Sequence, residues 1–386
     1  MKIYLLLLLF ACNALYSQGF QLGETYSDSN GFVEYTYGNL PLIISIPHGG
    51  ALRPTEIADR SCSGCILISD SFTQELGIAV VDAIVKESGC FPHLIVNKLH
   101  RSKMDANRAI AEAADGDSLA ELAWMAYTDF ISTATDTLNA YHDRGLFLDL
   151  HGHAHTKQRL ELGYLLSKED LQLDNEALDQ LEFVSKSSIR NLVMTNEEGH
   201  PLSQLLRGER SFGEQLVSRG VPAVPSLSDP YPESNDAYFT GGYNTAQYGS
   251  RTGGTIDAIQ IECNQDVRFD ADRRNAFAET LAIAIKEFLI LYYGADVGTV
   301  SCFVLDTEDV SQESFSIFPN PARTQFNIDS PSSSYRVTIH DFLGKCLRSY
   351  PKNEYNYDIS DLPAGNYVVT LLGNDIYLSK KLSVVR

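Results

Sequence analysis

The chain has 386 residues, 44% of them apolar, and a formal net charge of −20. This length allows two or three domains, and the apolar fraction is ordinary for a globular protein with a buried core. An acidic surface without a basic stretch argues against a nucleic-acid partner. The sequence also lacks a P-loop, a dinucleotide-binding fingerprint and the Gly-x-Ser-x-Gly elbow typical of serine hydrolases.

Residues 1–17 predict a signal peptide for export. Lys2 is followed by the apolar run Ile3–Ala11 and then by small and polar residues up to Ser17. The run is too short to span a bilayer, which needs about 20 apolar residues. No later stretch is apolar and long enough, so we expect no transmembrane helix in the mature chain. Leu9–Cys12 loosely resembles a lipoprotein cleavage box, which leaves two kinds of signal open.

An exported protein meets an oxidising compartment, where disulfides are stable. Cys62 and Cys65 form a Cys-x-x-Cys pair, and the sequence has no second pair of this kind. A four-thiolate zinc site is therefore not expected. We favour a local disulfide between these two cysteines over redox catalysis.

Residues 19–295 predict one α/β domain with a mixed, mostly parallel sheet flanked by helices. Apolar runs of strand length alternate here with longer amphipathic stretches, as in sheets covered on both faces. The expected strands are Leu42–Ile46, Leu94–Val96, Leu146–Leu150, Tyr164–Leu166, Val221–Val224 and Ala258–Ile261. The expected helices are Ser71–Ser88, Ser118–His142, Leu173–Leu192 and Ala271–Tyr293.

Four of these strands are followed by polar residues that can do chemistry. The groups that follow them are Pro47–Gly50 with His48, Arg101 with Asp105–Arg108, His151–His155, and Glu262–Asn264. In open α/β sheets, ligands bind beyond the carboxyl ends of the strands. We therefore expect these side chains to meet at one edge of the sheet.

His48 and His151 are candidate zinc ligands at the ends of two strands. A catalytic zinc ion takes three protein ligands and keeps one position for water. The third ligand would be a carboxylate, either Asp70, which directly precedes an expected helix, or Glu56. We interpret His153 as a residue that orients a ligand or contacts the substrate. Asp149 is expected on the opposite face of the strand from His151.

Glu262 is the candidate general base, because a carboxylate near a metal can accept a proton from water and pass it to a leaving nitrogen. Arg101, Asn107 and Arg108 indicate recognition of a substrate carboxylate, with a surface salt bridge as the alternative interpretation. The glycine- and aromatic-rich segment 238–250, which contains Tyr243, is expected to form a lid over the pocket.

Together, the segments Pro47–Gly50, Asp70, Arg101–Arg108, Asp149–His153 and Ile261–Glu262 resemble the N-formylglutamate amidohydrolase family. The resemblance covers about residues 35–290. It implies a hydrolase fold similar to that of the zinc carboxypeptidases and of the aspartoacylase and succinylglutamate desuccinylase group.

By this resemblance His48 and His151 bind zinc, Asn107 and Arg108 hold the substrate carboxylate, and Glu262 is the general base. The related groups place a glutamate three residues after the first histidine, where this chain has Ala51. Asp70 would take its place as the third ligand.

The C-terminal part differs in character from the rest. Residues 296–314 are mixed and polar and predict a linker. Residues 315–386 contain short β-like runs and many turn residues, which predict a small all-β sandwich. Phe318–Pro321 and Asp358–Tyr367 in this part resemble a type IX secretion C-terminal sorting domain. The resemblance implies recognition by the type IX export machinery at the outer membrane.

The sequence therefore predicts a secreted or cell-surface zinc enzyme that hydrolyses a linear amide bond of an N-acyl amino acid. One alternative is a carboxypeptidase-like enzyme that acts on extracellular peptides or cell-wall stems. The other is a surface binding module that has the fold but no metal.

Overall fold

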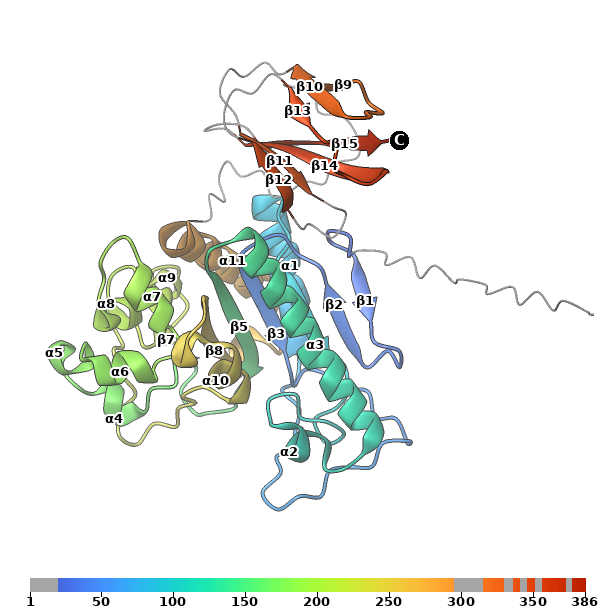
Figure 1. Ribbon diagram of the computed structural model, residues 1–386. Coiled ribbons are helices and arrows are strands. Elements are labelled where there is room, and N and C mark those ends of the chain that lie inside the picture. The colour runs from blue at the N-terminus through green and yellow to red at the C-terminus, as the bar shows by residue number, and fades with distance from the viewer. Residues whose placement is uncertain (1–19, 295–314, 330–335, 341–345, 351–355, 373–376) are drawn as a thin grey trace, which may run out of the picture. The chain divides into compact units, whose positions relative to one another are not determined.

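The structure is a computed structural model that describes residues 20–294, 315–329, 336–340, 346–350, 356–372 and 377–386 (Figure 1). The predicted signal peptide, residues 1–17, and the predicted linker, residues 296–314, lie outside these ranges. The chain divides into two compact units, Met1–Phe303 and Val304–Arg386. In the described residues no helix is long and apolar enough to cross a membrane.

An eight-stranded sheet forms the centre of the first unit, with the strand order β1-β2-β4-β3-β5-β8-β6-β7. The strands β4, β3, β5 and β8 are parallel to their neighbours within that group, whereas β1, β2 and β6 run antiparallel to a neighbour. The predicted mixed, mostly parallel sheet is thus confirmed. The strand bounds are β1 Thr25–Ser27, β2 Val33–Thr36, β3 Leu42–Ile46, β4 His93–Asn97, β5 Gly145–Gly152, β6 Leu160–Gly163, β7 Ala223–Val224 and β8 Ile256–Cys263.

Alternate residues of the central strands supply two separate cores, one on each face of the sheet. Ile44 and Leu148 belong to the core under α1 (Thr73–Ser88) and α11 (Ala271–Tyr293). The residues Ile43 and Phe147, each next in sequence to one of these, belong to the core under α3 (Ser118–Tyr141) (Figure 1). Successive side chains of a strand point to opposite faces, so a strand buried on both sides must be apolar throughout.

The remaining helices lie in the connections and are short. They are α2 Ile110–Ala114, α4 Lys168–Leu171, α5 Asn175–Leu178, α6 Leu181–Lys186, α7 Arg190–Thr195, α8 Leu202–Arg207, α9 Phe212–Val217 and α10 Tyr243–Tyr248. Two 3-10 turns, η1 Ser250–Thr252 and η2 Gln265–Val267, flank β8.

Two predicted elements are wrong. The expected helix Leu173–Leu192 is instead α5, α6 and the start of α7. Ser188 interrupts it, because its backbone carbonyl accepts hydrogen bonds from the sheet residue Ala258 at 3.1 Å and from Ser250 at 3.1 Å. The expected strand Tyr164–Leu166 does not form, since Leu165 has a left-handed backbone with φ 63°. The strand at this place, β6, ends before it.

The second unit is all β, as predicted. One sheet has the order β13-β10-β9 and the other the order β12-β11-β14-β15, and all pairs are antiparallel. A shared core, with Phe326 and Val369 among its buried members, lies between them. The strands are β9 Ser316–Phe318, β10 Gln325–Asp329, β11 Arg336–His340, β12 Cys346–Tyr350, β13 Tyr357–Asp358, β14 Gly365–Leu372 and β15 Tyr377–Val384.

Asp257 makes the stability of the first unit depend on pH. Burial raises the pKa of this β8 carboxyl from 3.8 to about 6, although Ser250 and Tyr293 donate hydrogen bonds to it. Between these two pH values the folded state binds more protons than the unfolded state, so the free energy of unfolding falls as the pH rises.

We expect Asp257→Asn to remove roughly 3 kcal/mol of this decline between pH 3.8 and 7. Urea denaturation of both full-length proteins at pH 4 and pH 7 measures the difference, because all other carboxyls contribute equally to the two. An identical decline in both proteins would contradict the role of Asp257.

Candidate metal centre and active site

Three predicted ligands converge at the carboxyl edge of the sheet. His48 follows β3, His151 lies near the end of β5, and Asp70 precedes α1. The ring Nδ1 atoms of both histidines lie 3.3 Å from Oδ2 of Asp70. Ligand atoms of the three side chains all lie within 4.8 Å of one another, and both histidines are buried. The alternative ligand, Glu56, is exposed and is not part of this group.

The backbone around these residues is held closely in place. Asp70 donates its N–H to the carbonyl of His48 at 3.0 Å, and its Oδ2 accepts the N–H of Gly152 at 3.1 Å. The loop after His48 runs so close to its neighbours that a Cβ at Gly49 would lie 2.5 Å from the backbone nitrogen of Gln74. The glycines after His48 therefore serve close packing, and the three side chains do not depend on a flexible loop.

Each histidine is oriented by a second, buried carboxylate. His48 Nε2 lies 2.7 Å from Oδ1 of Asp105, and His151 Nε2 lies 2.8 Å from Oδ2 of Asp149. The expectation that Asp149 lies on the opposite face from His151 is wrong, because residues two apart in a strand share a face. Carboxylates that hold the far nitrogen of an imidazole are typical of metal-binding histidines, whose ring they orient and make more basic.

This arrangement directs three electron-rich atoms at one point. When Nε2 of each ring donates its proton to its carboxylate, both Nδ1 atoms present lone pairs toward the Asp70 oxygen. Such atoms repel each other unless a positive charge lies between them. Burial lowers the pKa of His151, but Asp149 and Asp70 raise it well above the ordinary value, so a proton meets this need on one ring. A divalent cation meets it on both rings at once, and the residues therefore fit a metal ion.

Arg101 and Asn107, two predicted substrate-binding residues, lie beside this group. Arg101 donates from Nε to Asp105 at 2.9 Å, and its Nη1 lies 3.8 Å from Oδ1 of Asp70. Asn107 has its Nδ2 3.3 Å from Nε2 of His151. Both side chains are buried and border the site, and Arg101 also holds the carboxylate of Asp105 in place.

The segment with Tyr243 reaches the same place from another part of the chain. Asn244, in α10, donates its backbone N–H to Oδ1 of Asn107 at 2.7 Å and its side-chain amide to Asp149 at 3.3 Å. Tyr243 itself is half-buried at the start of α10, and no hydrogen bond of its side chain is seen in the part of the chain that is described. The segment expected to form a lid thus contains a short helix that is hydrogen-bonded to Asn107 and Asp149.

Glu262 lies next to His151, since the two residues are partners in the register of β5 and β8. Its Oε1 accepts a hydrogen bond from Gln260 at 3.0 Å, and its buried Oε2 has no partner in the described residues. Burial raises the pKa of Glu262 to about 8, an effect that His151 opposes and that Asp70 and Glu161 increase. A carboxyl group with this pKa can both accept and release a proton near neutral pH.

Two predicted site residues point elsewhere. The guanidinium of Arg108 pairs with Glu112 at 3.0 Å on the surface and also donates to the carbonyl of Asn107 at 2.7 Å. His153 is buried with both ring nitrogens engaged, Nε2 at 2.9 Å from the carbonyl of Arg159 and Nδ1 accepting the N–H of His155 at 3.0 Å. His153 therefore has no free ring nitrogen for a substrate, and Arg108 is held at the surface by Glu112.

Neither Asp105 nor Asp149 was predicted as the partner of a histidine. The period of two in a strand could have found Asp149, two residues before His151. Asp105 lies in an irregular loop 57 residues after His48, and only the fold brings it there. The predicted disulfide between Cys62 and Cys65 is present, and buried Arg60 donates to the carbonyl of Ile66 just after it.

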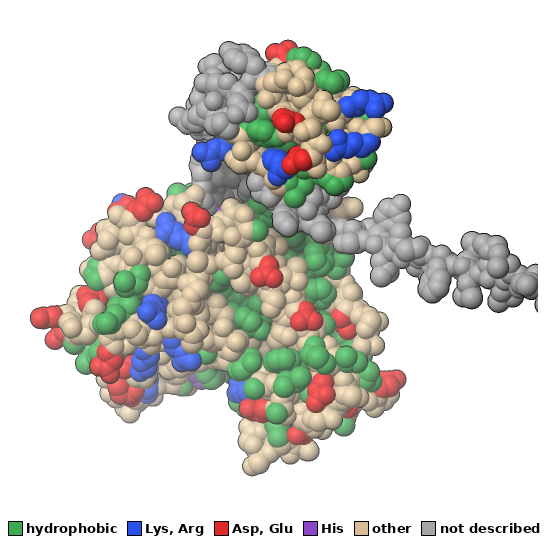
Figure 2. Space-filling view, viewed as in Figure 1, with side chains coloured by type: hydrophobic (Ala, Val, Ile, Leu, Met, Phe, Trp, Pro, Cys, Tyr) green, Lys and Arg blue, Asp and Glu red, His purple; other side chains and the backbone are tan. Residues whose placement is uncertain are grey.

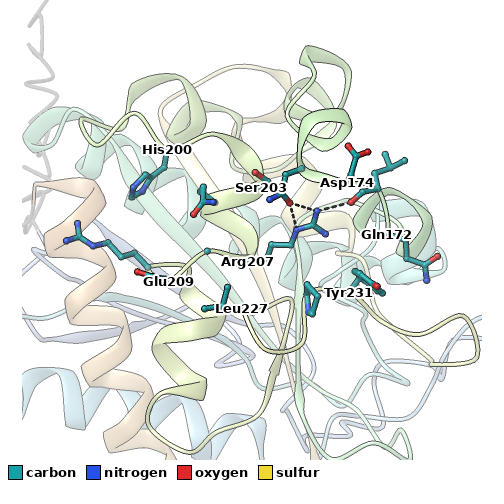
Figure 3. A pocket seen from close by; sticks show the side chains of 14 residues that line it. Gln172, Asp174, His200, Ser203, Arg207, Glu209, Leu227 and Tyr231 are labelled. Carbon is teal, nitrogen blue, oxygen red and sulfur yellow. Dashed lines mark hydrogen bonds between the residues drawn. The ribbon is translucent and has the colours of Figure 1, made fainter.

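A separate pocket of about 670 Å³ is lined by residues of α5, α8 and the segment around Tyr231 and contains no residue of the metal group. Figure 3 shows the side chains that line it. Its Arg207 donates to the carbonyls of Leu171 and Leu173 and to Asn175, so most donors of this guanidinium are already engaged. On the face of the larger unit shown in Figure 2, acidic and basic side chains are interspersed, without a basic stripe.

Residues 316–385 match the family model of the secretion system C-terminal sorting domain. This match confirms the sorting domain that the sequence predicts. The C-terminal unit is therefore a sorting domain.

Similarity to solved structures is low. An N-formylglutamate amidohydrolase from Ralstonia eutropha JMP134 is 13% identical with a TM-score of 0.38, over 66% of this chain and 95% of that chain. A gene product of Agrobacterium tumefaciens is 12% identical with a TM-score of 0.37, over 67% and 94%. The CwlD amidase from Clostridioides difficile, in complex with the GerS lipoprotein, is 11% identical with a TM-score of 0.26, over 64% and 98%. No curated protein matches the chain. At these scores the likeness does not establish an activity.

We expect Asp149→Asn to weaken zinc binding by roughly tenfold or more, because an amide makes the ring of His151 less basic and fixes it less firmly. Competition with a chromogenic chelator measures the affinity. Asp143→Asn changes an exposed carboxylate after α3 and is the matched control, with unchanged affinity. Equal affinities of all three proteins would show that Asp149 does not orient a ligand.

Proposed function

We propose that the chain is an exported zinc-dependent amidohydrolase that cleaves a linear amide bond next to a carboxylate. The observation that carries the proposal is the convergence of His48 and His151, each oriented by its own carboxylate, on one oxygen of Asp70. Glu262 on the adjacent strand supports it, because a proton acceptor beside the metal group is what amide hydrolysis requires.

The residues have separate roles in this mechanism. His48, Asp70 and His151 would hold a zinc ion, which would lower the pKa of a bound water and supply positive charge for the substrate carbonyl. Glu262 accepts the proton of the attacking water at Oε2 and returns it to the leaving nitrogen. Arg101 and Asn107 border the group and would hold polar atoms of the substrate, and α10 with Tyr243 would limit the access of water.

The location supports an extracellular substrate. The sorting domain matched at residues 316–385 and the signal peptide predicted at residues 1–17 would together take the enzyme across both membranes. An N-acyl amino acid or a short peptide fits this location. A carboxypeptidase-like activity and a metal-free binding module are the alternatives that the experiments below exclude or establish.

Zinc content tests the metal centre directly. We expect the purified full-length protein to contain about one zinc ion per chain, and His48→Ala to contain less than about a tenth of that, because one of three ligands is lost. Elemental analysis after dialysis gives both values. The control His142→Ala removes a histidine at the opposite end of the sheet and should keep its zinc. Wild-type protein without zinc would favour the binding module.

Glu262→Gln tests the proton transfer. We expect turnover to fall by about 10²-fold or more, in line with the loss of a general base, while zinc stays bound. Initial rates on N-formyl, N-acetyl and peptidyl amino acids measure the activity, and the preferred group of substrates separates an amidase from a peptidase. Unchanged rates in this variant would disprove the role of Glu262.

A further inference from the structure

Three acidic or basic side chains lie in a row across neighbouring strands at the carboxyl edge of the sheet. His151 on β5 is the register partner of Glu262 on β8. Glu262 is in turn the register partner of Glu161 on β6. Directly paired side chains lie on the same face and close together. Glu161 therefore stands on the far side of Glu262 from the metal group, and the proposed mechanism gives it no role.

Glu161 holds the imidazole of His155. Its Oε1 lies 2.8 Å from Nδ1 of His155, and its Oε2 accepts the backbone N–H of Phe239 at 2.9 Å. The carboxylate is 1% exposed, whereas the histidine side chain is 23% exposed. The ring of His155 stacks on Phe239 with the centroids 4.8 Å apart and the planes at 18°. The ring is thus fixed at one edge and on one face, and part of it reaches solvent.

A second metal ion does not explain this group, although His153, His155 and Glu161 lie close enough to hold one. Both ring nitrogens of His153 are engaged with the backbone, and both oxygens of Glu161 accept hydrogen bonds. A cation would have to break several of these contacts. The pair of Glu161 and His155 instead resembles an oriented donor, in which Nδ1–H is committed to the carboxylate and Nε2 has no partner among the residues described.

We propose that His155 is a substrate-contact residue, whose Nε2–H donates a hydrogen bond to the carboxylate that flanks the scissile amide. This inference rests on the proposed function and names the group that recognises the acidic end of the substrate. Glu161 accepts the hydrogen bond from Nδ1–H and thereby fixes the direction of the ring.

The other cations near this edge already have partners, and Arg101 pairs with Asp105 at 2.9 Å. Arg108 pairs with Glu112 at the surface. Arg159 pairs with Asp229 at 2.6 Å and with Asp236 at 2.9 Å. Arg268 donates to backbone carbonyls, among them that of His153 at 3.0 Å. Among these side chains, His155 is the one that combines a fixed ring, partial exposure and an uncommitted nitrogen.

Two substitutions of His155 separate contact with the substrate from a structural role. His155→Asn places an amide near Nδ1, so it keeps the contact with Glu161 and loses the outer nitrogen. His155→Gln places an amide near Nε2, so it keeps a donor toward the substrate and loses the contact with Glu161. If His155 has a purely structural role, His155→Asn should keep the wild-type binding better than His155→Gln. If His155 recognises the substrate carboxylate, His155→Gln should keep it better.

The probes are N-acetyl-L-alanine and its C-terminal amide, with dissociation constants measured by NMR titration of the zinc-loaded full-length protein. We expect the wild type and His155→Gln to bind the acid roughly tenfold more tightly than the amide, as a hydrogen bond to a charged group allows. In His155→Asn this preference should fall to about one. For hydrolysed substrates the loss should appear in KM, with kcat nearly unchanged.

A wild type that binds both probes equally, or a preference that survives in His155→Asn, would overturn the inference. So would a preference that is lost in Arg108→Ala and kept in both His155 variants. If His155→Asn still prefers the acid and the wild type hydrolyses its substrates, the proposed function stands and only the role of His155 is removed. If the wild type prefers the acid through His155 but hydrolyses no substrate, the proposed hydrolase function fails and the contact of His155 with a carboxylate stands.

Discussion

The structure of the candidate site depends on one constraint: two buried imidazoles must turn the same nitrogen, Nδ1, toward one point. Asp105 and Asp149 impose it by binding the opposite nitrogen of His48 and His151. These carboxylates are themselves fixed, since Asp149 accepts a hydrogen bond from Ser45 at 2.8 Å. Without this outer layer either ring could rotate or change its protonated nitrogen, and Asp70 would face no defined pair of ligands.

The register of the sheet places the residues of the site next to one another in a row. Parallel strands β3, β5 and β8 end at the same edge, and their registers place Glu262 beside His151 and Glu161 beside Glu262. Strand β6 is antiparallel to β8, so the start of β6 lies at this edge. Glu161, near that start, is therefore paired with Glu262. The metal ligand His151, the proton acceptor Glu262 and the pair of Glu161 and His155 thus follow one another across the strands. An extended substrate could lie along this row.

Segments that are remote in the chain close the site. Asn244 reaches Asn107 and Asp149 from α10, and a Cβ at Gly242 would lie 2.4 Å from the side chain of Asn107. Only glycine allows such an approach, so the start of α10 and the loop with Asn107 form one unit. Movements of α10 would therefore change the support of His151 as well as access to the site.

The sequence by itself determined the classes of residue and their order. Apolar runs of strand length followed by His48, His151 and Glu262 predicted the central strands and the chemistry at their ends, because burial on both faces demands such runs. Turn residues and short β-like runs likewise predicted the all-β unit, which its two antiparallel sheets confirm. The residues left the carboxylate ligand open between Asp70 and Glu56, and the resemblance favoured Asp70.

Only the tertiary structure decided which side chains meet. Asp105 joins His48 through an irregular loop, Arg108 turns to Glu112, and the free imidazole edge belongs to His155 and not to His153. These outcomes depend on hydrogen bonds between segments far apart in the chain or on a choice between near neighbours. Local pattern carries no information about either, since both are fixed by packing.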